Sequence, residues 1–230
     1  MKKFNKKRIV FILVWTFLPI GIFMLQTANN NLNQKTVATM SVPVTNRTII
    51  VDAGHGGEDG GAVSSNGVSE AQINLSIALK LQNLLEQSGA TVVLTRSDDN
   101  AIYDLDKTTL REKKNSDLKN RVKIGNTSSA DIFVSIHLNK IEQSQYYGWQ
   151  TFFKDGNEQG KKLATCIQEN LNEAIQKENK RTPLKISNIY IIKNVEIPTT
   201  IVECGFLSNP EEEKLLQTDE YQNKLVWGIY

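Results

Sequence analysis

The chain contains two histidines, and each follows an apolar run that predicts a strand. His55 follows Ile-Ile-Val-Asp-Ala-Gly at residues 49–54, and His137 follows Ile-Phe-Val-Ser-Ile at residues 132–136. Ligands gather at the carboxyl ends of strands in open α/β sheets, and neutral imidazole is the commonest metal ligand in proteins. Two histidines at the tips of different strands therefore favour one shared metal site. The alternative is that each is a loop-capping or partly buried residue, unrelated to the other.

Two histidines need a carboxylate partner, because catalytic zinc usually takes three protein ligands, in sets such as His₂Glu, together with a water. Glu70 opens the helix that follows the His55 loop, although a first-turn glutamate also complements a helix dipole. Glu203 ends the apolar strand at residues 199–202, where a buried carboxylate lacks an easy structural explanation. Both glutamates are therefore candidates for the site.

The segment between His55 and residue 62 is rich in glycine, which permits tight turns and a close approach to a metal or a glycan. A phosphate-binding loop would need a Lys-Ser/Thr pair at the start of the helix, and that pair is absent. Glu58 and Asp59 lie in this segment and are expected to be solvated.

Three further polar residues are candidates for supporting roles. Asp52 and Asn139 flank the histidines and could orient ligands or substrate, or could equally cap turns and bond loops. Arg96 could bind a substrate carboxylate, but a structural ion pair is the favoured interpretation.

The apolar periodicity predicts six short strands interleaved with helices, which is the pattern of a single α/β domain. We expect a mostly parallel twisted sheet with helices on both faces. The expected strands are 48–52, 91–95, 132–136, 148–153, 190–192 and 199–202, and the expected helices are 70–87, 118–125, 160–176 and 210–230. A long polar surface loop is expected at 98–116.

The N-terminus predicts export. Five basic residues precede an apolar run from Ile9 to Leu25, as in a signal peptide or signal-anchor, and the sequence leaves cleavage open. Residues 26–45 are expected to form a polar linker, and residues 46–230 the catalytic domain. Residues 1–25 hold five of the 27 basic residues and no acidic one, so 22 basic residues face 25 acidic ones in the remainder. That balance argues against nucleic-acid binding, and we expect membrane contact only through the N-terminal segment.

Five blocks of the sequence, in order, are similar to those of bacterial zinc-dependent N-acetylmuramoyl-L-alanine amidases. The blocks are Val-Asp-Ala-Gly-His-Gly-Gly-Glu-Asp-Gly-Gly-Ala (51–62), Ser-Glu with Asn-Leu (69–70, 74–75), Leu-Thr-Arg (94–96), Ser-Ile-His-Leu-Asn (135–139) and Ile-Val-Glu-Cys-Gly-Phe-Leu-Ser-Asn (201–209). Such an ordered set is far more specific than one motif. Within this family the chain most resembles the sporulation branch that prepares spore-cortex peptidoglycan for germination.

The resemblance implies that His55, Glu70 and His137 ligate Zn²⁺ and that Glu203 is the catalytic carboxylate. It implies hydrolysis of the amide between the lactyl group of N-acetylmuramic acid and L-alanine, which would permit later formation of muramic lactam. The expected partners are the glycan and stem peptide of peptidoglycan, with an activating protein as a further option. The alternatives are a zinc peptidase acting on stem peptides and a non-catalytic peptidoglycan-binding module.

Overall fold

The computed structural model describes residues 20, 24, 26 and 44–230. The predicted signal segment and linker therefore lie almost wholly outside the described residues. Residues Val44–Tyr230 form one compact unit. In the part of the chain that is described, we find no helix with the length and apolar character needed to cross a bilayer.

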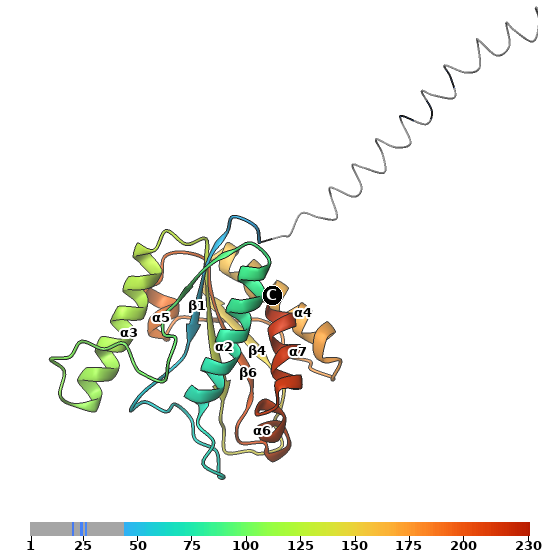
Figure 1. Cartoon of the computed structure of the whole chain (residues 1–230). Helices are drawn as coiled ribbons and strands as arrows, with labels where there is room; N and C mark the ends of the chain where they lie inside the picture. Colours follow the sequence, from blue (N-terminus) through green and yellow to red (C-terminus); the bar gives the residue numbers. More distant parts are fainter. Residues whose placement is uncertain (1–19, 21–23, 25, 27–43) are drawn as a thin grey trace, which may run out of the picture. The chain divides into compact units, whose positions relative to one another are not determined.

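Six strands form one sheet in the order β2-β1-β3-β6-β4-β5 (Figure 1). The strands are β1 (Thr48–Ala53), β2 (Thr91–Leu94), β3 (Ile132–Asn139), β4 (Gln150–Lys154), β5 (Leu184–Ile186) and β6 (Thr199–Phe206). The first four in the spatial order are mutually parallel, whereas β4 runs antiparallel to β6 and parallel to β5. The prediction of a mostly parallel α/β sheet is confirmed.

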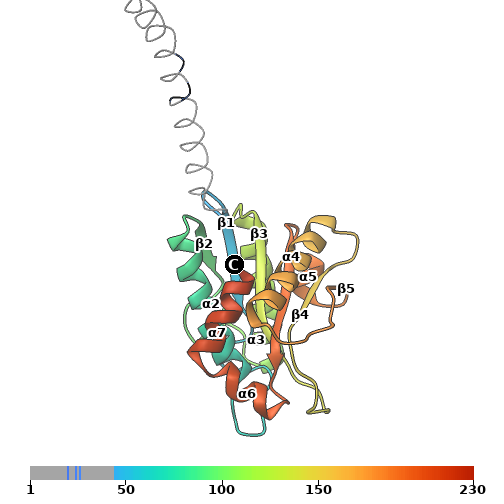
Figure 2. The ribbon, with the colours of Figure 1, turned by 90° about the vertical axis from the view of Figure 1, so that its right-hand side faces the viewer.

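Helices cover both faces of this sheet (Figures 1 and 2). The helices are α2 (Glu70–Gln87), α3 (Leu110–Thr127), α4 (Glu158–Ile175), α5 (Tyr190–Asn194), α6 (Pro210–Leu216) and α7 (Asp219–Ile229). The larger apolar core joins the sheet to α2, α4 and α7, and a smaller one joins it to α3 and α5. A sheet buried between two helical layers is what the apolar strands require.

The alternation of side chains along the strands gives the α3 face a different chemical character from the other. In β1, Val51 and Ala53 belong to the larger core, and Ile50 belongs to the smaller one. Asp52 and Ser135, neighbours on β1 and β3, are fully buried on that second side. The sheet face that packs against α3 is therefore polar near the carboxyl ends of its strands. The candidate site lies at these strand ends.

One predicted strand is wrong. Residues 190–192 begin the short helix α5, and Ile191 and Ile192 are buried in it. The remaining strand of the sheet is instead β5 (Leu184–Ile186), which the sequence pattern did not predict. A short apolar run cannot by itself distinguish a strand from a buried helical turn, and the strand Leu184–Ile186 is only three residues long and largely exposed.

Two predicted helices have different bounds. Helix α3 begins at Leu110 rather than 118, so the expected loop at 98–116 ends in helix. A capping box starts it, with Thr109 and Glu112 each accepting a hydrogen bond from the other's backbone N–H. The predicted C-terminal helix is two helices, because Thr218 accepts from the Tyr221 N–H and starts α7 anew.

Candidate metal centre

The site lies where three neighbouring strands of the sheet end. The Gly54 N–H donates to the Ile136 carbonyl at 3.0 Å, so the chain leaving β1 stays against β3 as it reaches His55. His137 and Glu203 are paired positions on the parallel strands β3 and β6. The spatial order β1-β3-β6 therefore brings His137 and Glu203 to the same edge of the sheet as His55, although they follow it by 82 and 148 residues in the sequence.

His55, Glu70 and His137 form a cluster of potential metal ligands. One ligand atom from each residue lies within 4.8 Å of the others. Glu70 Oε1 is 3.3 Å from His55 Nε2 and 2.9 Å from His137 Nδ1. The two imidazole rings meet edge to face with centroids 4.9 Å apart. Two imidazole nitrogens and one carboxylate oxygen thus converge on one point, as a His₂Glu site requires.

The carboxylate of Glu70 is held firmly at the start of α2. Its Oε2 accepts the Ala62 N–H at 2.8 Å, and its Oε1 accepts the Leu138 N–H at 3.0 Å and the Asn74 side-chain amide at 3.3 Å. Burial acts to raise the pKa of Glu70, but hydrogen bonds from His137 and His55 outweigh it and hold that pKa far below its usual range. Glu70 is therefore ionised and preoriented.

Two glycines let the backbone approach the cluster closely. A Cβ atom at Gly54 would lie 2.3 Å from the His137 ring, and one at Gly61 would lie 2.6 Å from Glu70 Oε2. Gly61 also has a positive φ of 67°. The close packing explains why the loop around His55 is glycine-rich.

Glu203 lies beside this cluster but differs from Glu70. Its Oε2 is buried and has no hydrogen-bond partner among the described residues. Burial raises the pKa of Glu203 to about 7, the nearby Glu70 charge adds to that effect, and His137 and His55 oppose it. A carboxyl with a pKa near neutrality can both accept and release a proton, as a general base and acid must.

Asp59 lies closer to the cluster than the sequence suggested. It was expected to be solvated, but its Oδ2 is 3.0 Å from His55 Nδ1 and 3.1 Å from the Lys114 ammonium. Burial acts to lower the pKa of His55, yet the hydrogen bonds to Asp59 and Glu70 raise it to about 9. A carboxylate on one ring nitrogen directs the other nitrogen toward the centre. The sequence held one signal for this contact, because Asp59 is a carboxylate four residues after the candidate ligand His55.

Asp52 makes no hydrogen bond to the cluster itself and is linked to it through Arg121. It is fully buried and accepts from Thr95 Oγ1, Ser135 Oγ and Arg121 Nη1, the last at 2.6 Å. Arg121 in turn donates to the His55 carbonyl at 2.6 Å. Asp52 therefore helps to position the His55 backbone and touches no side chain of the cluster. Arg121 was missed, because in the sequence it looks like one more charge on a polar helix.

Arg96 and Asn139 lie near the site in other ways. Arg96 is buried, and its guanidinium donates to the backbone carbonyls of Ala53, Gly54, Ala71 and Asp98. It therefore ties the β1 end to α2 through backbone carbonyls, and no ion pair of Arg96 is found within the described residues. Asn139 ends β3, and its carbonyl accepts the Leu207 N–H at 2.8 Å, which holds the end of β3 against the end of β6.

Both cysteines are free; Cys204 is buried in the core and Cys166 is exposed.

Two known proteins that are similar to this chain are named as amidases. The germination-specific N-acetylmuramoyl-L-alanine amidase of Bacillus subtilis is 34% identical over 209 residues, which are 91% of this chain and 86% of the relative. The CwlD amidase of Clostridioides difficile, solved in complex with the GerS lipoprotein, has 49% identity and a TM-score of 0.79 over 80% of this chain and 95% of that one.

A third relative extends the comparison. The catalytic domain of CwlV, an N-acetylmuramoyl-L-alanine amidase from Bacillus (Paenibacillus) polymyxa, is 33% identical with a TM-score of 0.67, over 80% of this chain and 93% of that chain. The family described as N-acetylmuramoyl-L-alanine amidase matches residues 49–230, which include every strand of the sheet except the first residue of β1 and every residue of the cluster. The chain therefore belongs to the N-acetylmuramoyl-L-alanine amidase family, as an enzyme of that class.

Proposed function

We propose that this chain is a zinc-dependent amidase that hydrolyses the bond between the lactyl group of N-acetylmuramic acid and L-alanine in peptidoglycan. His55, Glu70 and His137 hold the metal, and Glu203 transfers the protons. The observation that carries this proposal is the pair of carboxylates at one strand edge, one ionised and fully hydrogen-bonded, the other buried with a free oxygen.

The donor set fits zinc. Zinc bonds to imidazole nitrogen and carboxylate oxygen are about 2.0–2.2 Å long, so ligand atoms of a tetrahedral site lie about 3.4 Å apart. The Glu70 Oε1 atom is 2.9 and 3.3 Å from the two nearest imidazole nitrogens. Magnesium and calcium prefer all-oxygen sites, so two imidazoles argue for a transition metal.

Proton transfer falls to Glu203. As a carboxylate it takes a proton from the attacking water, and as a carboxylic acid it returns that proton to the leaving amine of L-alanine. The pairing of Glu203 with His137 on neighbouring strands supports this role, because it brings the carboxyl close to the proposed metal site. A bound zinc ion would supply Lewis-acid polarisation of the carbonyl and a lowered pKa for water.

Muropeptide digestion with mass spectrometry tests the reaction. Incubation of the zinc-loaded protein with purified peptidoglycan should release peptides with a free L-alanine amino group and leave muramic acid with a free lactyl carboxylate. Products with intact lactyl–alanine bonds but shortened stem peptides would identify a zinc peptidase instead. Binding without any cleavage would identify a non-catalytic module.

We extend the proposal to the biological setting. The similarity to a germination-specific amidase supports action on spore-cortex peptidoglycan, where removal of stem peptides permits formation of muramic lactam. Action outside the cytoplasm follows from the substrate and from the basic and apolar segments of residues 1–25. The amidase solved with the GerS lipoprotein supports an accessory protein that stabilises or activates the enzyme.

Deletion of the gene region for this chain in its host tests that setting. Spores should then retain stem peptides on cortex glycans and lack muramic lactam. Spores with normal muramic-lactam content would contradict the cortex role and leave the amidase chemistry untouched.

A further inference from the structure

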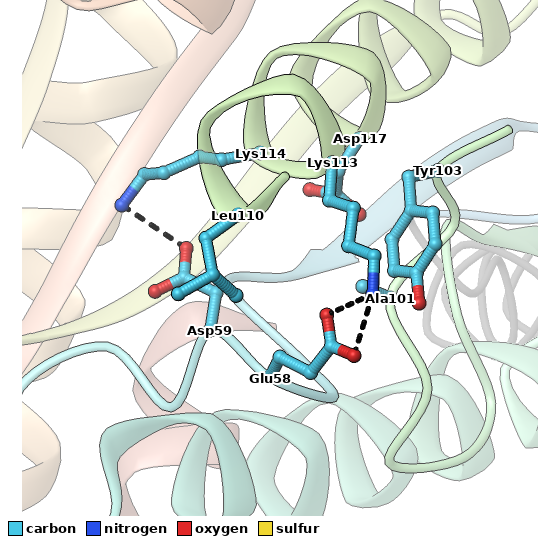
Figure 3. A pocket seen from close by; sticks show the side chains of 8 residues that line it. All are labelled: Glu58, Asp59, Ala101, Tyr103, Leu110, Lys113, Lys114 and Asp117. Atoms are coloured by element: carbon cyan, nitrogen blue, oxygen red, sulfur yellow. Dashed lines mark hydrogen bonds and ion pairs between the residues drawn. The ribbon is translucent and has the colours of Figure 1, made fainter. Parts of the chain in front are cut away.

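A pocket of about 150 Å³ lies between the loop that carries Glu58 and Asp59 and the first turns of α3 (Figure 3). Its walls combine charged, aromatic and apolar side chains, of which only Asp59, through its contact with His55, has a part in the proposed metal site. Those that carry the inference are Glu58, Asp59, Tyr103, Leu110, Lys113 and Lys114.

One side chain separates this pocket from the metal cluster. Asp59 lines the pocket and contacts His55 Nδ1 at 3.0 Å, while the Lys114 ammonium lies 3.1 Å from the same carboxylate oxygen. A substrate whose scissile amide lies at the cluster can therefore extend its neighbouring residues toward the pocket.

Lys113 is the fixed cation of the pocket. Its ammonium lies 5.0 Å from the centroid of the Tyr103 ring, and its side chain is 20% exposed. Both oxygens of Glu58 lie 2.7 Å from that ammonium, in the arrangement that a bound carboxylate would take (Figure 3).

Glu58 is the exchangeable partner in this pair. Its side chain is 49% exposed, and ion pairs at exposed positions contribute about 0–1 kcal/mol. Another carboxylate can therefore replace it at little cost. The third acid in the pocket wall, Asp117, is already bound by Arg121 through two hydrogen bonds and does not compete for Lys113.

We propose that this pocket is a subsite for the stem peptide, in which Lys113 binds a free carboxylate of the residues beyond L-alanine. Glu58 occupies the place of that carboxylate until substrate binds. Lys114 adds a second positive charge, and Leu110, 69% exposed at the pocket, offers apolar contact to the peptide. The inference rests on the proposed amidase activity and adds a basis for substrate preference to it.

Opposite effects of two substitutions test the subsite. The substrates are two soluble muramoyl peptides that differ only at the residue after L-alanine, which carries either a free carboxylate or its amide. In the zinc-loaded full chain, Lys113→Gln should raise KM for the acidic peptide about tenfold, with kcat within twofold and no change for the amidated peptide. Glu58→Gln should lower KM for the acidic peptide several-fold, because it removes the internal competitor.

If the salt bridge between Lys113 and Glu58 had only a structural role, the pattern would differ. Loss of either partner would then change KM in the same direction, and equally for the two substrates. Lys224→Gln, which removes the lysine of a surface pair with Glu220 on α7, is the matched control and should leave both KM values unchanged. Overturning results are an unchanged preference for the acidic peptide in Lys113→Gln, or a raised KM in Glu58→Gln. If the wild type cleaves neither peptide nor peptidoglycan, the amidase assignment itself fails; if it cleaves both peptides equally well, only the subsite fails.

Discussion

The two carboxylates at the strand edge have opposite surroundings. Glu70, at the start of α2, accepts two backbone N–H groups and one side-chain amide, and the histidine rings on either side keep its pKa low. Glu203, within β6, has a buried oxygen without a hydrogen-bond partner in the described part of the chain, and burial raises its pKa to about 7.

This difference supports the proposed division of tasks between the two residues. A metal ligand must be ionised and fixed in orientation, because each donor atom has to meet the ion at a set distance. A proton-transfer group must change its charge during the reaction, so a pKa near the working pH suits it. Opposite shifts in neighbouring carboxyls are a known sign of such a division. We therefore expect the two positions to respond differently to the same substitution.

The largest expected effect is on metal binding. Glu70→Ala should weaken zinc affinity about a thousandfold or more, because it removes one of three ligands, whereas loss of a mere supporting group costs about 10–100-fold. Glu203→Ala should leave zinc affinity within a few fold. Competition with a chromophoric chelator measures both. Equal losses in the two variants would abolish the distinction between ligand and base.

The pH dependence of stability gives the next largest effect. The pKa of Glu203 in the folded protein is about 7, above its ordinary 4.5, so the folded state holds a proton that the unfolded state releases. The contribution of Glu203 to stability is therefore full below pH 4.5 and falls as pH rises through 7, by up to about 3 kcal/mol. Glu203→Gln should remove this fall in the metal-free protein.

Urea unfolding at several pH values checks this prediction, because other groups titrate equally in both proteins. The wild type should lose stability relative to Glu203→Gln between pH 4.5 and 7. Parallel curves would show that the free oxygen of Glu203 is solvated in solution and that its pKa is ordinary.

The smallest of the three effects concerns Asp59. Asp59→Asn should lower zinc affinity about 10–100-fold, because an amide holds the His55 ring less firmly than a carboxylate does. The fold should stay intact, since Asp59 lies in a partly exposed loop. Isothermal titration with zinc, alongside the circular dichroism spectrum, measures both. The control is Asp155→Asn, which removes a carboxylate from an exposed surface pair. A zinc affinity in Asp59→Asn equal to that of the wild type would contradict this prediction. The backbone hydrogen bonds of Gly54 to β3 and of Arg121 to the His55 carbonyl would then suffice to position His55.

The sequence predicted the elements of the fold well where the apolar periodicity was strong, as in the strands β1 and β3 and in the helix α2. It failed where a segment owes its form to its surroundings. Ile191 and Ile192 are apolar enough for a strand, but they fill the smaller core as one helical turn. Leu184–Ile186 pairs with β4 at the sheet edge although its own pattern is weak. Tertiary contacts decided both cases.

For the candidate site, the sequence supplied the residues but not the contacts. Histidines at strand ends and a glutamate at a helix start are visible as patterns, and the family resemblance separated Glu70 from Glu203. The support from Asp59 and Arg121 was hidden, because it depends on a loop that folds back and on a helix 66 residues away in sequence. Arg96 shows the same limit, since its partners are backbone carbonyls that no sequence pattern marks.

The most direct test of the account is Glu203→Gln, assayed for zinc content and for muropeptide cleavage in the same preparation. We predict a full complement of zinc and a loss of turnover of about 10²–10⁴-fold, because the amide cannot accept the proton of the attacking water. Zinc content measured by elemental analysis separates this result from a collapsed site. A variant that keeps zinc and cleaves at the wild-type rate would contradict the assignment of Glu203 as the proton-transfer group.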